Sequence, residues 1–431
     1  MQKQDTKPYA ISRHLVMSAY ERVKSNQGSA GVDGVSLTEF DEHLKDNLYK
    51  IWNRMSSGSY FPPAVKLVEI PKSGGGVRPL GIPTVGDRVA QMTAVLILQP
   101  LIEPCFHPDS YAYRPGLSAH AALSKARERC WKYDWVLDLD IRQFFDSIDH
   151  VLLMKAVRKH TDCPWILLYI ERWLSVPYAL PDGTLQSRTK GVPQGSVIGP
   201  LLANLFLHYA FDMWMSQRYP DIPFERYADD TVCHCRSYEE ATALQSAISE
   251  RLLVCQLELH PQKTKIVYCK DTRRKGEFEN VTFDFLGYTF SPRRAAGKQK
   301  SIFTGYLPSI SNKSMQRIMD KVRSWKLNRQ VHVSLNQIAD YINPIVRGWI
   351  TYYGKFYPTK LKSFLKQLNH ALAGWVTRKY KRFRGKRRRA YYWLGDISER
   401  DNSLFYHWKW GAVPAHTPRL NMRLDKKSRV R

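Results

Sequence analysis

The first two thirds of the chain alternate short strand-like stretches with longer helical ones. Between Val65 and Ile70 every second side chain falls on the same face, and three glycines then interrupt the pattern, which predicts a β-hairpin. In residues 135–141 the apolar positions lie on one face, with Asp138 and Asp140 on the other. A buried strand therefore presents carboxylates.

Two later segments also have strand character. Residues 224–235 predict a strand, a tight turn and a second strand, and residues 283–290 predict a short strand or hairpin. A loop rich in Gly and Pro, residues 191–200, leads into an apolar helical run. Helical spacing predicts helices at 8–26, 87–103, 150–160, 164–175, 201–215 and 238–257. The body is predicted to be mixed α/β, with polar groups at strand ends.

The pattern changes near residue 300. After the stretch rich in Gly and Lys at 293–300 we expect helices alone, with apolar stripes at 315–325, 335–342 and 361–375. Pro344 is expected to kink or split the second of these helices. A three-helix bundle is the simplest architecture for this region.

Charge is distributed unevenly along the 431 residues. The chain carries a net charge of +27; residues 1–290 hold 34 basic and 33 acidic side chains, whereas residues 291–431 hold 32 and 6. A nearly neutral body with a basic appendage suggests that one part performs chemistry while the other holds a polyanion, most simply nucleic acid. The composition is that of a folded protein, and a uniformly basic packaging protein would look different.

Cysteine usage and hydropathy point to an intracellular protein. The seven cysteines are scattered and form no CxxC pair, so we expect reduced core cysteines rather than a zinc site or a secreted disulfide framework. No apolar run approaches the ~18 residues of a membrane span, and the N-terminus lacks the apolar core of a signal peptide. We expect a cytoplasmic protein that does not enter membranes.

Three carboxylates carry the candidate chemistry. Asp229 and Asp230 are neighbours, and neighbouring strand residues converge only at a tight hairpin turn. With Asp140 from another strand they could hold two Mg²⁺ ions, the arrangement that activates a 3′-hydroxyl and stabilises leaving pyrophosphate. Asp138 shares a face with Asp140, so periodicity alone leaves both open. His234, between two cysteines, is expected to pack in the core.

The ordered motifs resemble those of a known family. RYADD, LDLDIRQFFDSIDH, PQGSVIGPLLANLF and FLGY resemble the palm motifs of reverse transcriptases, in the usual order. The segments 31–36, 70–89, 343–356 and 404–411 further resemble signatures of the bacterial group II intron reverse transcriptase/maturase family. The resemblance runs from about residue 16 to 411. No paired-cysteine His-Asn-His nuclease segment, which some relatives append, is expected.

The resemblance implies roles for individual residues. Asp140, Asp229 and Asp230 correspond to the metal-binding carboxylates, because the family places an aromatic residue five positions after the catalytic aspartate and Phe145 stands there. Phe145 is then the steric gate that excludes a ribose 2′-hydroxyl and favours dNTPs. The further implied residues are Lys72, Arg78 and Gln194 for dNTP binding, Lys263 (with Lys265 as a neighbouring alternative) as proton donor, and Leu286 and Gly287 in the primer grip.

The resemblance also implies an architecture and partners. We expect an α/β (α+β) right-hand polymerase, with fingers and an antiparallel palm sheet in residues 1–300 (fingers to about 130, palm from about 131). An all-helical thumb/maturase region in 301–390 and a basic segment in 391–431 follow. Arg387, Arg388 and Arg389 are expected to contact nucleic acid.

The expected activity is RNA-directed DNA polymerisation from a DNA or RNA primer on an RNA template, with two Mg²⁺ ions and dNTPs. Splicing and retrohoming of a parent group II intron RNA are the implied cellular roles. Two alternatives stay open: a domesticated, free-standing reverse transcriptase in DNA repair or phage defence, and an RNA-binding maturase without polymerase activity. The sequence indicates neither a protein partner nor an oligomeric state.

Overall fold

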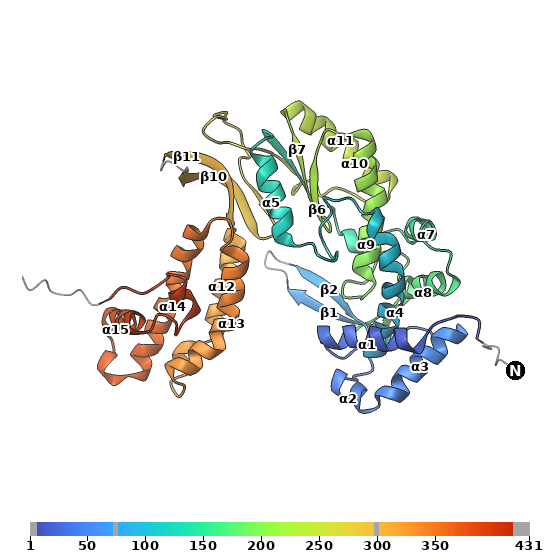
Figure 1. Ribbon diagram of the computed structural model, residues 1–431, viewed down its shortest axis with the longest axis horizontal. Helices are drawn as coiled ribbons and strands as arrows, with labels where there is room; N and C mark the ends of the chain where they lie inside the picture. Colours follow the sequence, from blue (N-terminus) through green and yellow to red (C-terminus); the bar gives the residue numbers. More distant parts are fainter. Residues whose placement is uncertain (1–6, 72–75, 297–300, 417–431) are drawn as a thin grey trace, which may run out of the picture. The chain divides into compact units, whose positions relative to one another are not determined.

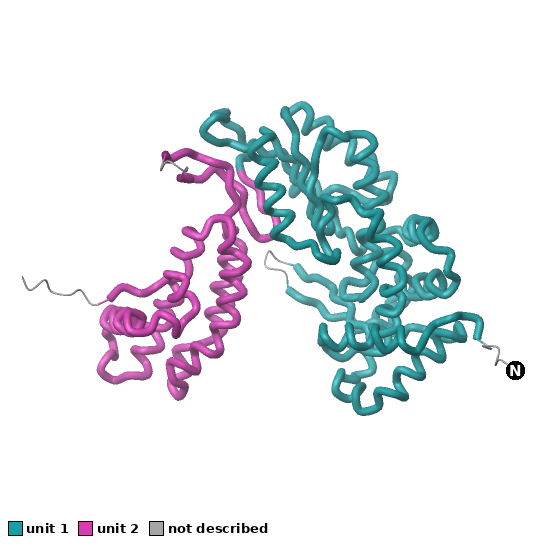
Figure 2. Tube along the Cα trace, in the orientation of Figure 1, with its two compact units in different colours: residues 1–281 teal, residues 282–431 magenta. Residues whose placement is uncertain are grey.

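The chain divides into two compact units. A computed structural model describes residues 7–71, 76–296 and 301–416, and its two units are Met1–Val281 and Thr282–Arg431 (Figure 2). The predicted dNTP-binding residue Lys72 lies outside the described residues. The units are called unit 1 and unit 2 below.

Unit 1 combines helices with two four-stranded sheets (Figure 1). Its helices are α1 (Arg13–Asn26), α2 (Leu37–Glu42), α3 (Leu44–Ser57), α4 (Val85–Ile102), η1 (Glu103–Cys105), α5 (Ala119–Cys130), α6 (Phe144–Ser147), α7 (His150–Arg158), α8 (Pro164–Ser175), α9 (Gly199–Leu207), the π-helix η2 (His208–Asp212), α10 (Met213–Arg218) and α11 (Tyr238–Val254). The first sheet has the order β2-β1-β4-β5, with strands β1 (Val65–Pro71), β2 (Val77–Ile82), β4 (Tyr178–Ala179) and β5 (Leu185–Gln186). The predicted hairpin is the β1–β2 pair.

The second sheet, called the central sheet, is antiparallel and has the order β6-β7-β3-β8. Its strands are β3 (Trp135–Leu139), β6 (Phe224–Tyr227), β7 (Asp230–Cys235) and β8 (Lys265–Tyr268). One face belongs to the main core of unit 1, where Leu137 and Cys233 are paired and fully buried. Helix α5 lies against β6, as Figure 1 shows. The strand and turn predictions for 135–141 and 224–235 are confirmed.

Hydroxyl and carboxylate side chains define where many helices begin. Ser12 accepts a hydrogen bond from the Leu15 amide, so α1 begins at residue 13 rather than at the predicted residue 8. Asp149 caps α7 in the same way, and Ser334 forms a complete capping box with Gln337 at the start of α13. These local contacts define the first turn of each of these helices.

Unit 2 begins with a three-stranded antiparallel sheet of order β11-β10-β9. Its elements are β9 (Phe283–Phe285), β10 (Tyr288–Ala296), β11 (Ile302–Ile310), α12 (Asn312–Ser324), η3 (Leu327–Arg329), α13 (Leu335–Tyr353), α14 (Pro358–Lys379), η4 (Lys381–Phe383), α15 (Arg387–Arg400) and α16 (Tyr406–Lys409). One prediction was wrong: the chain after residue 300 is not helical alone, because β11 is a strand. Helix α13 is not split at Pro344, and a kink at this residue stays a prediction.

The helices of unit 2 enclose their own core. Trp375 and Trp408 are 0% and 1% exposed, and Trp325 is buried as well. The other tryptophans of the region, Trp349, Trp393 and Trp410, pack against the same core from partly buried positions. These rings therefore stabilise unit 2 and are not free platforms for bases.

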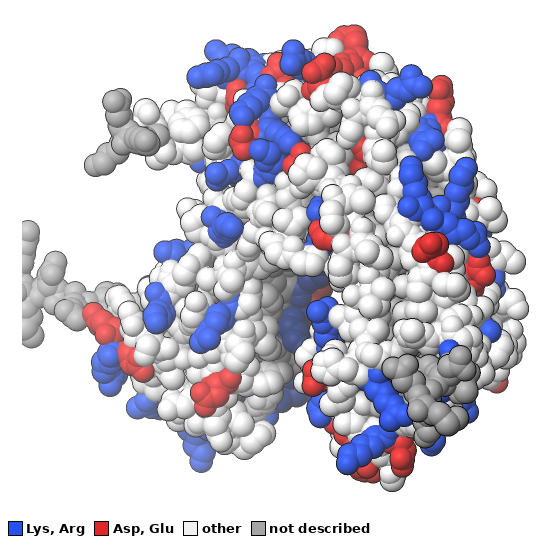
Figure 3. All heavy atoms as spheres, turned by 45° about the vertical axis from the view of Figure 1, so that its right-hand side comes forward, with Lys and Arg blue, Asp and Glu red and all other residues white. Residues whose placement is uncertain are grey.

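Basic and acidic side chains both appear on the molecular surface drawn in Figure 3. The basic run that begins at Arg378 ends in α15, where residues 386–389 are all exposed.

In the described part of the chain, no helix combines the length and the apolar character that a membrane crossing requires.

Candidate active site

A two-residue turn between β6 and β7 presents the neighbouring carboxylates. Tyr227 pairs with Asp230, so Ala228 and Asp229 form the turn itself. Ala228 has φ of +59°, a left-handed conformation that costs a non-glycine residue about 1–2 kcal/mol. Two-residue hairpins require positive φ at the first turn position, which explains the conformation but not the choice of alanine. The strain indicates that surrounding contacts hold this turn in place.

Strand register brings Asp140 to the same side of the central sheet as Asp230. Asp138 pairs with Val232, and paired residues in an antiparallel sheet share a face. Asp140 is two residues after Asp138, and Asp230 is two residues before Val232. Because side chains alternate along a strand, Asp140 and Asp230 therefore lie on that same face. Asp140 comes directly after the last residue of β3, and its side chain is about one third exposed at 34%.

The electrostatics of the three carboxylates are coupled. Burial raises the pKa of Asp230 to about 6, with the charges of Asp229 and Asp140 as further causes. Burial also raises the pKa of Asp229, and the Asp140 charge adds to it. The Asp140 charge thus disfavours ionisation of both Asp229 and Asp230, and a nearby cation would favour it.

Two cations compensate part of this negative charge. The Lys263 ammonium lies 3.3 Å and 3.4 Å from the two carboxylate oxygens of Asp140. Arg78, on β2, lowers the pKa of both Asp229 and Asp230 through its charge. The structure thus brings the predicted Lys263 and Arg78 to the carboxylates, whereas Lys265 lies within β8 opposite Asp138.

The carboxylates suit a hard divalent cation. Oxygen donors are what Mg²⁺ prefers, and a cation would counter the burial and the neighbouring negative charge that raise the pKa values of Asp229 and Asp230. In the described residues no three His, Cys, Asp or Glu side chains are grouped as a metal site. The chemistry of the three carboxylates fits such a cation, while Asp140 is paired with Lys263 in this structure.

Phe145 and its neighbour have different environments. Phe144 is 2% exposed and belongs to the main core, whereas Phe145 is half-buried and only packs against that core. Their ring centroids are 5.2 Å apart. Phe145 thus has the partial exposure that contact with a substrate requires.

The loop before α9 is joined to the β1–β2 hairpin. The Gly81 amide donates to the carbonyl oxygen of Gln194 at 2.7 Å. Gly195 has φ of +109°, and a Cβ there would lie 2.4 Å from the Gly81 carbonyl oxygen, so only glycine fits. The predicted residues Gln194 and Arg78 therefore lie on two segments that are bonded to each other.

A buried polar pair that sequence reasoning missed supports the same loop. Gln91 accepts from the amides of Val197 at 2.7 Å and Ile198 at 3.2 Å, and donates to Asp87. Asp87 is 1% exposed and also accepts from two other side chains, Tyr60 and Trp173. Burial raises the pKa of Asp87. The signal available in the sequence was a polar pair four residues apart inside an apolar helix.

Tyr113 is a further site residue that the sequence did not indicate. It has φ of +57° and is 54% exposed. Burial of part of the ring raises the pKa of its hydroxyl, followed by the charges of Asp229 and Tyr227. A strained, half-exposed aromatic residue beside the carboxylates is typical of a substrate contact.

The predicted primer-grip residues form the β9–β10 turn of unit 2. Leu286 and Gly287 have φ of +51° and +78°, as a two-residue hairpin turn requires. The Tyr352 hydroxyl donates to the Leu286 carbonyl at 2.9 Å, and the Gly287 carbonyl accepts from the Ser311 amide and the Ser314 hydroxyl, both at 3.0 Å. The turn is rigidly attached to α12 and α13.

The three arginines at the start of α15 are exposed. Arg387 donates to the His370 carbonyl at 3.0 Å, and Arg388 donates to the Tyr392 hydroxyl at 3.0 Å. Each guanidinium keeps further donors that can reach a phosphate.

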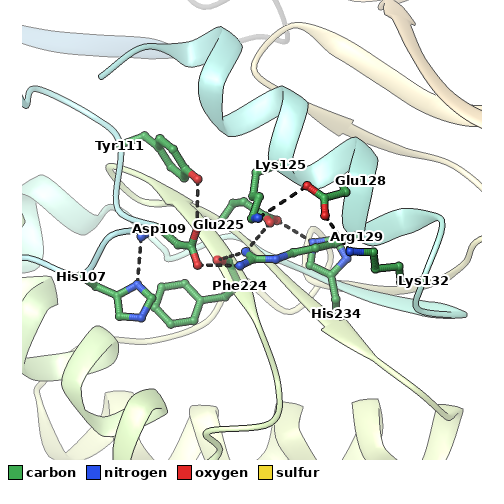
Figure 4. Close-up of polar contacts among 10 residues, drawn as sticks. All are labelled: His107, Asp109, Tyr111, Lys125, Glu128, Arg129, Lys132, Phe224, Glu225 and His234. Carbon is green, nitrogen blue, oxygen red and sulfur yellow. Dashed lines mark hydrogen bonds and ion pairs between the residues drawn. The ribbon is translucent and has the colours of Figure 1, made fainter. Parts of the chain in front are cut away.

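His234 is buried, but in a polar environment. Its Nε2 lies 2.5 Å from Glu225, and Glu225 also accepts from Arg129 at 2.6 Å. Figure 4 shows the Arg129 guanidinium between the carboxylates of Glu225 and Asp109. His234 therefore belongs to a buried ionic cluster, and the flanking cysteines are buried on the other face.

Known protein families match segments of both units. The family described as reverse transcriptase (RNA-dependent DNA polymerase) matches residues 70–290, and the group II intron maturase-specific domain matches residues 315–393. Protein YkfC of Escherichia coli (strain K12) is 37% identical over 196 residues, 44% of this chain and 50% of that protein. Group II intron-encoded protein LtrA of Lactococcus lactis subsp. cremoris is 29% identical over 268 residues, 62% of this chain and 43% of that protein.

The alignments thus span half or less of the length of these curated relatives. A solved structure of apo telomerase from Candida tropicalis, truncated from the C-terminal domain, has a TM-score of 0.41 at 13% identity over 53% of each chain. Polymerases of the matched family generally use divalent metals. The family match covers half of the chain and includes Asp140, Asp229 and Asp230. The protein belongs to the reverse transcriptase (RNA-dependent DNA polymerase) family and carries a group II intron maturase-specific domain.

Proposed function

We propose that this protein is an RNA-directed DNA polymerase that adds dNMP to a primer 3′ end, and a maturase that assists splicing and retrohoming of a group II intron RNA. The observation that carries the polymerase is the β6–β7 turn, which presents Asp229 and Asp230 on the side of the central sheet where Asp140 follows β3. The family match supports this assignment.

Each residue has a role in this reaction. Asp140, Asp229 and Asp230 would hold two Mg²⁺ ions, which activate the primer hydroxyl and stabilise the leaving pyrophosphate. Arg78 and Gln194, together with Lys72, would bind the dNTP, and Phe145 would close the space beside its 2′-carbon. Lys263, freed from Asp140, would supply a proton to the pyrophosphate. Leu286 and Gly287 would support the primer.

A basic groove in unit 2 supports the RNA-binding role. It lies along α12, η3 and α14, has a volume of about 620 Å³, and no carboxylate is among its described lining residues. Its cationic lining residues are Arg323, Lys326, Arg378 and Arg387. Such a groove is complementary to an RNA backbone. It lies in the part of the chain, residues 301–390, that we assign to the thumb and maturase region.

Primer extension on an RNA template with dNTPs and Mg²⁺ tests the polymerase assignment. Loss of one carboxylate ligand is expected to remove about 4 kcal/mol of transition-state stabilisation, roughly a thousandfold in rate. Asp229→Ala should almost abolish extension and leave RNA binding and any splicing assistance largely intact.

Asp138→Asn is the matched control, because Asp138 shares the sheet face of Asp140 but lies inside β3. This variant should retain extension, whereas Asp140→Asn should not. Comparable extension by Asp229→Ala and the wild type would remove the site assignment. RNA binding without extension by the wild type would instead favour a maturase that does not polymerise.

A further inference from the structure

A buried arginine joins the carboxylate turn to the helix behind it. Arg226, on β6, is 1% exposed and donates to both carboxylate oxygens of Asp212, from Nε at 2.7 Å and from Nη2 at 2.6 Å. Its third nitrogen, Nη1, donates to the Ala228 carbonyl and to Oδ1 of Asn204, both at 3.1 Å. The ion pair with Asp212 fixes the position of the Arg226 guanidinium, and the guanidinium in turn fixes the Ala228 carbonyl of the turn.

The bonded carbonyl is the one that controls the direction of Asp229. The Ala228 carbonyl belongs to the peptide that links Ala228 to Asp229, so fixing its oxygen fixes the orientation of this peptide plane. Ala228 is also the residue with the strained, left-handed backbone. A charged donor to this oxygen therefore acts at the position where the turn would otherwise relax.

The helix behind the turn is distorted where it provides the anchor. Asn204 and Asp212 are eight residues apart, which in an ideal α-helix leaves about 80° between their directions around the axis. The wider π-helix η2, His208–Asp212, ends at Asp212, and both side chains reach Arg226. Single π-turns are frequent at functional sites.

A second buried ion pair on the same strand provides a comparison. Glu225 faces the opposite side of β6 and binds Arg129 of α5, as drawn in Figure 4. Arg129 also binds the Phe224 carbonyl and Asp109. None of these three partners of Arg129 lies in the turn, residues 227–230. Arg129 is less buried than Arg226, with 13% against 1% of its side chain exposed, and the two pairs differ in whether they contact this turn.

We propose that Arg226 is a positioning residue that sets the direction of Asp229 through the Ala228 carbonyl and thereby the geometry in which the carboxylates meet a metal ion. Asp212 and Asn204 hold Arg226 in place for this task. The inference rests on the proposed polymerase function for its kinetic consequence. The contact with the turn, rather than the burial of an ion pair, is the property that matters.

A double variant separates positioning from stability. Arg226→Met with Asp212→Leu removes both buried charges and keeps apolar volume, and such replacements often preserve stability. The melting temperature should stay near that of the wild type, while amide hydrogen exchange in residues 227–230 becomes faster. In primer extension kcat should fall about a hundredfold, the effect expected of a small misplacement at a reacting centre. The Mg²⁺ concentration for half-maximal rate should rise, with KM for primer-template unchanged.

Arg129→Gln is the matched control. It breaks the other buried pair, so the melting temperature should fall, but exchange in residues 227–230 and kcat should stay at wild-type values. Asp212→Asn is a second probe that keeps the shape of the site. It should increase exchange in the turn and lower kcat by a smaller factor than the double variant.

A folded double variant with wild-type exchange, kcat and Mg²⁺ dependence would overturn the proposal, and so would equal effects in Arg129→Gln. If the double variant does not fold, unchanged exchange and kcat in Asp212→Asn would overturn it. A wild-type protein that incorporates no dNMP would contradict the proposed function, and hydrogen exchange in the turn would still decide whether Arg226 positions it.

Discussion

Phe145 is the side chain that we propose to set the choice between dNTP and rNTP. Its half-buried ring lies beside the fully buried Phe144, so shortening it changes the surface of the site more than the core. Phe145→Val or Phe145→Ala should raise the ratio of rNTP to dNTP incorporation by about tenfold or more, if ~1.4 kcal/mol of steric exclusion is lost. Single-nucleotide incorporation with competing dNTP and rNTP measures this ratio.

The neighbouring Phe144→Leu provides the control for this prediction. It removes buried ring volume, so the free energy of unfolding should fall while the sugar preference stays the same. Unchanged sugar selectivity in the Phe145 variants would show that this ring only packs against the core and does not select the sugar.

At the same scale, the sequence indicated the three candidate carboxylates but not the buried residues that support them. Asp140, Asp229 and Asp230 were found from strand periodicity and the family motifs. Their support was missed because buried polar residues look like exposed ones when only the sequence is read. One signal was present: Asn204, His208 and Asp212 recur every four residues inside an apolar helix, and all three are buried.

Among the secondary-structure elements, the sequence predicts strands where apolar and polar side chains alternate. It does not indicate a strand where glycine or proline interrupts this pattern. The segment 302–310 contains Gly305 and Pro308, which argue against a strand. It forms β11 because it lies at the sheet edge, where the amide that Pro308 lacks is not needed on the outer side. Helix α13 continues through Pro344 because its neighbours Ile342 and Val346 are buried in the core of unit 2.

The segment around α16 is held by two asparagines of longer helices. Asn343 of α13 donates to the Leu404 carbonyl and accepts from the Tyr406 amide, both at 2.9 Å. Asn369 of α14 accepts from His407 and Trp408 and donates to the Ala412 carbonyl at 2.9 Å. These side chains replace backbone partners that an irregular segment would otherwise lack.

This segment makes unit 2 sensitive to acid. Burial lowers the pKa of His407 to about 3, so the folded state keeps this imidazole neutral. The stabilisation is present above the unfolded pKa of about 6.5 and is lost as the pH falls toward the folded value. Between pH 7 and pH 5 the free energy of unfolding should fall by about 2 kcal/mol from this residue alone.

Thermal unfolding of the wild type and of His407→Gln at both pH values measures the effect. The glutamine can still donate to Asn369 but does not titrate, so the variant should lose less stability between pH 7 and pH 5. Equal losses in the two proteins would show that His407 is not the responsible group.

On the scale of the whole molecule, charge is concentrated in one part. The exposed arginines 387–389 lie in a run, Arg378 to Arg389, that contains nine basic residues and no acidic one. Each phosphate contact that is lost should flatten the slope of log affinity against log salt by roughly 0.7 to 0.9. Changing all three arginines to Gln should weaken RNA binding at physiological salt and flatten the slope by about two units. Filter binding over a salt series measures this.

A matched triple variant on unit 1, Lys155, Arg158 and Lys159 to Gln, removes the same number of exposed charges from α7. It should leave the salt slope unchanged. Primer extension by the arginine variant should recover at low salt or high template concentration. The same slope in the arginine variant and the wild type would exclude this cluster, including Arg387 at the edge of the groove, from nucleic-acid contact and leave Arg323, Lys326 and Arg378 as the candidate cations of the groove.

The two asparagine anchors also bear on the order in which the chain folds during synthesis. Phe405 and Trp408 fill the core of unit 2 from the far end of its sequence, and Asn369 has its partners there. Until residue 405 has been synthesised, the helices of unit 2 lack these partners. They therefore expose apolar side chains and the side-chain amide of Asn369, which are buried in the folded unit. Unit 1, whose core residues all precede 282, can complete its packing during that interval. Translation thus allows the unit that carries the three carboxylates to pack before the unit that is proposed to hold the RNA.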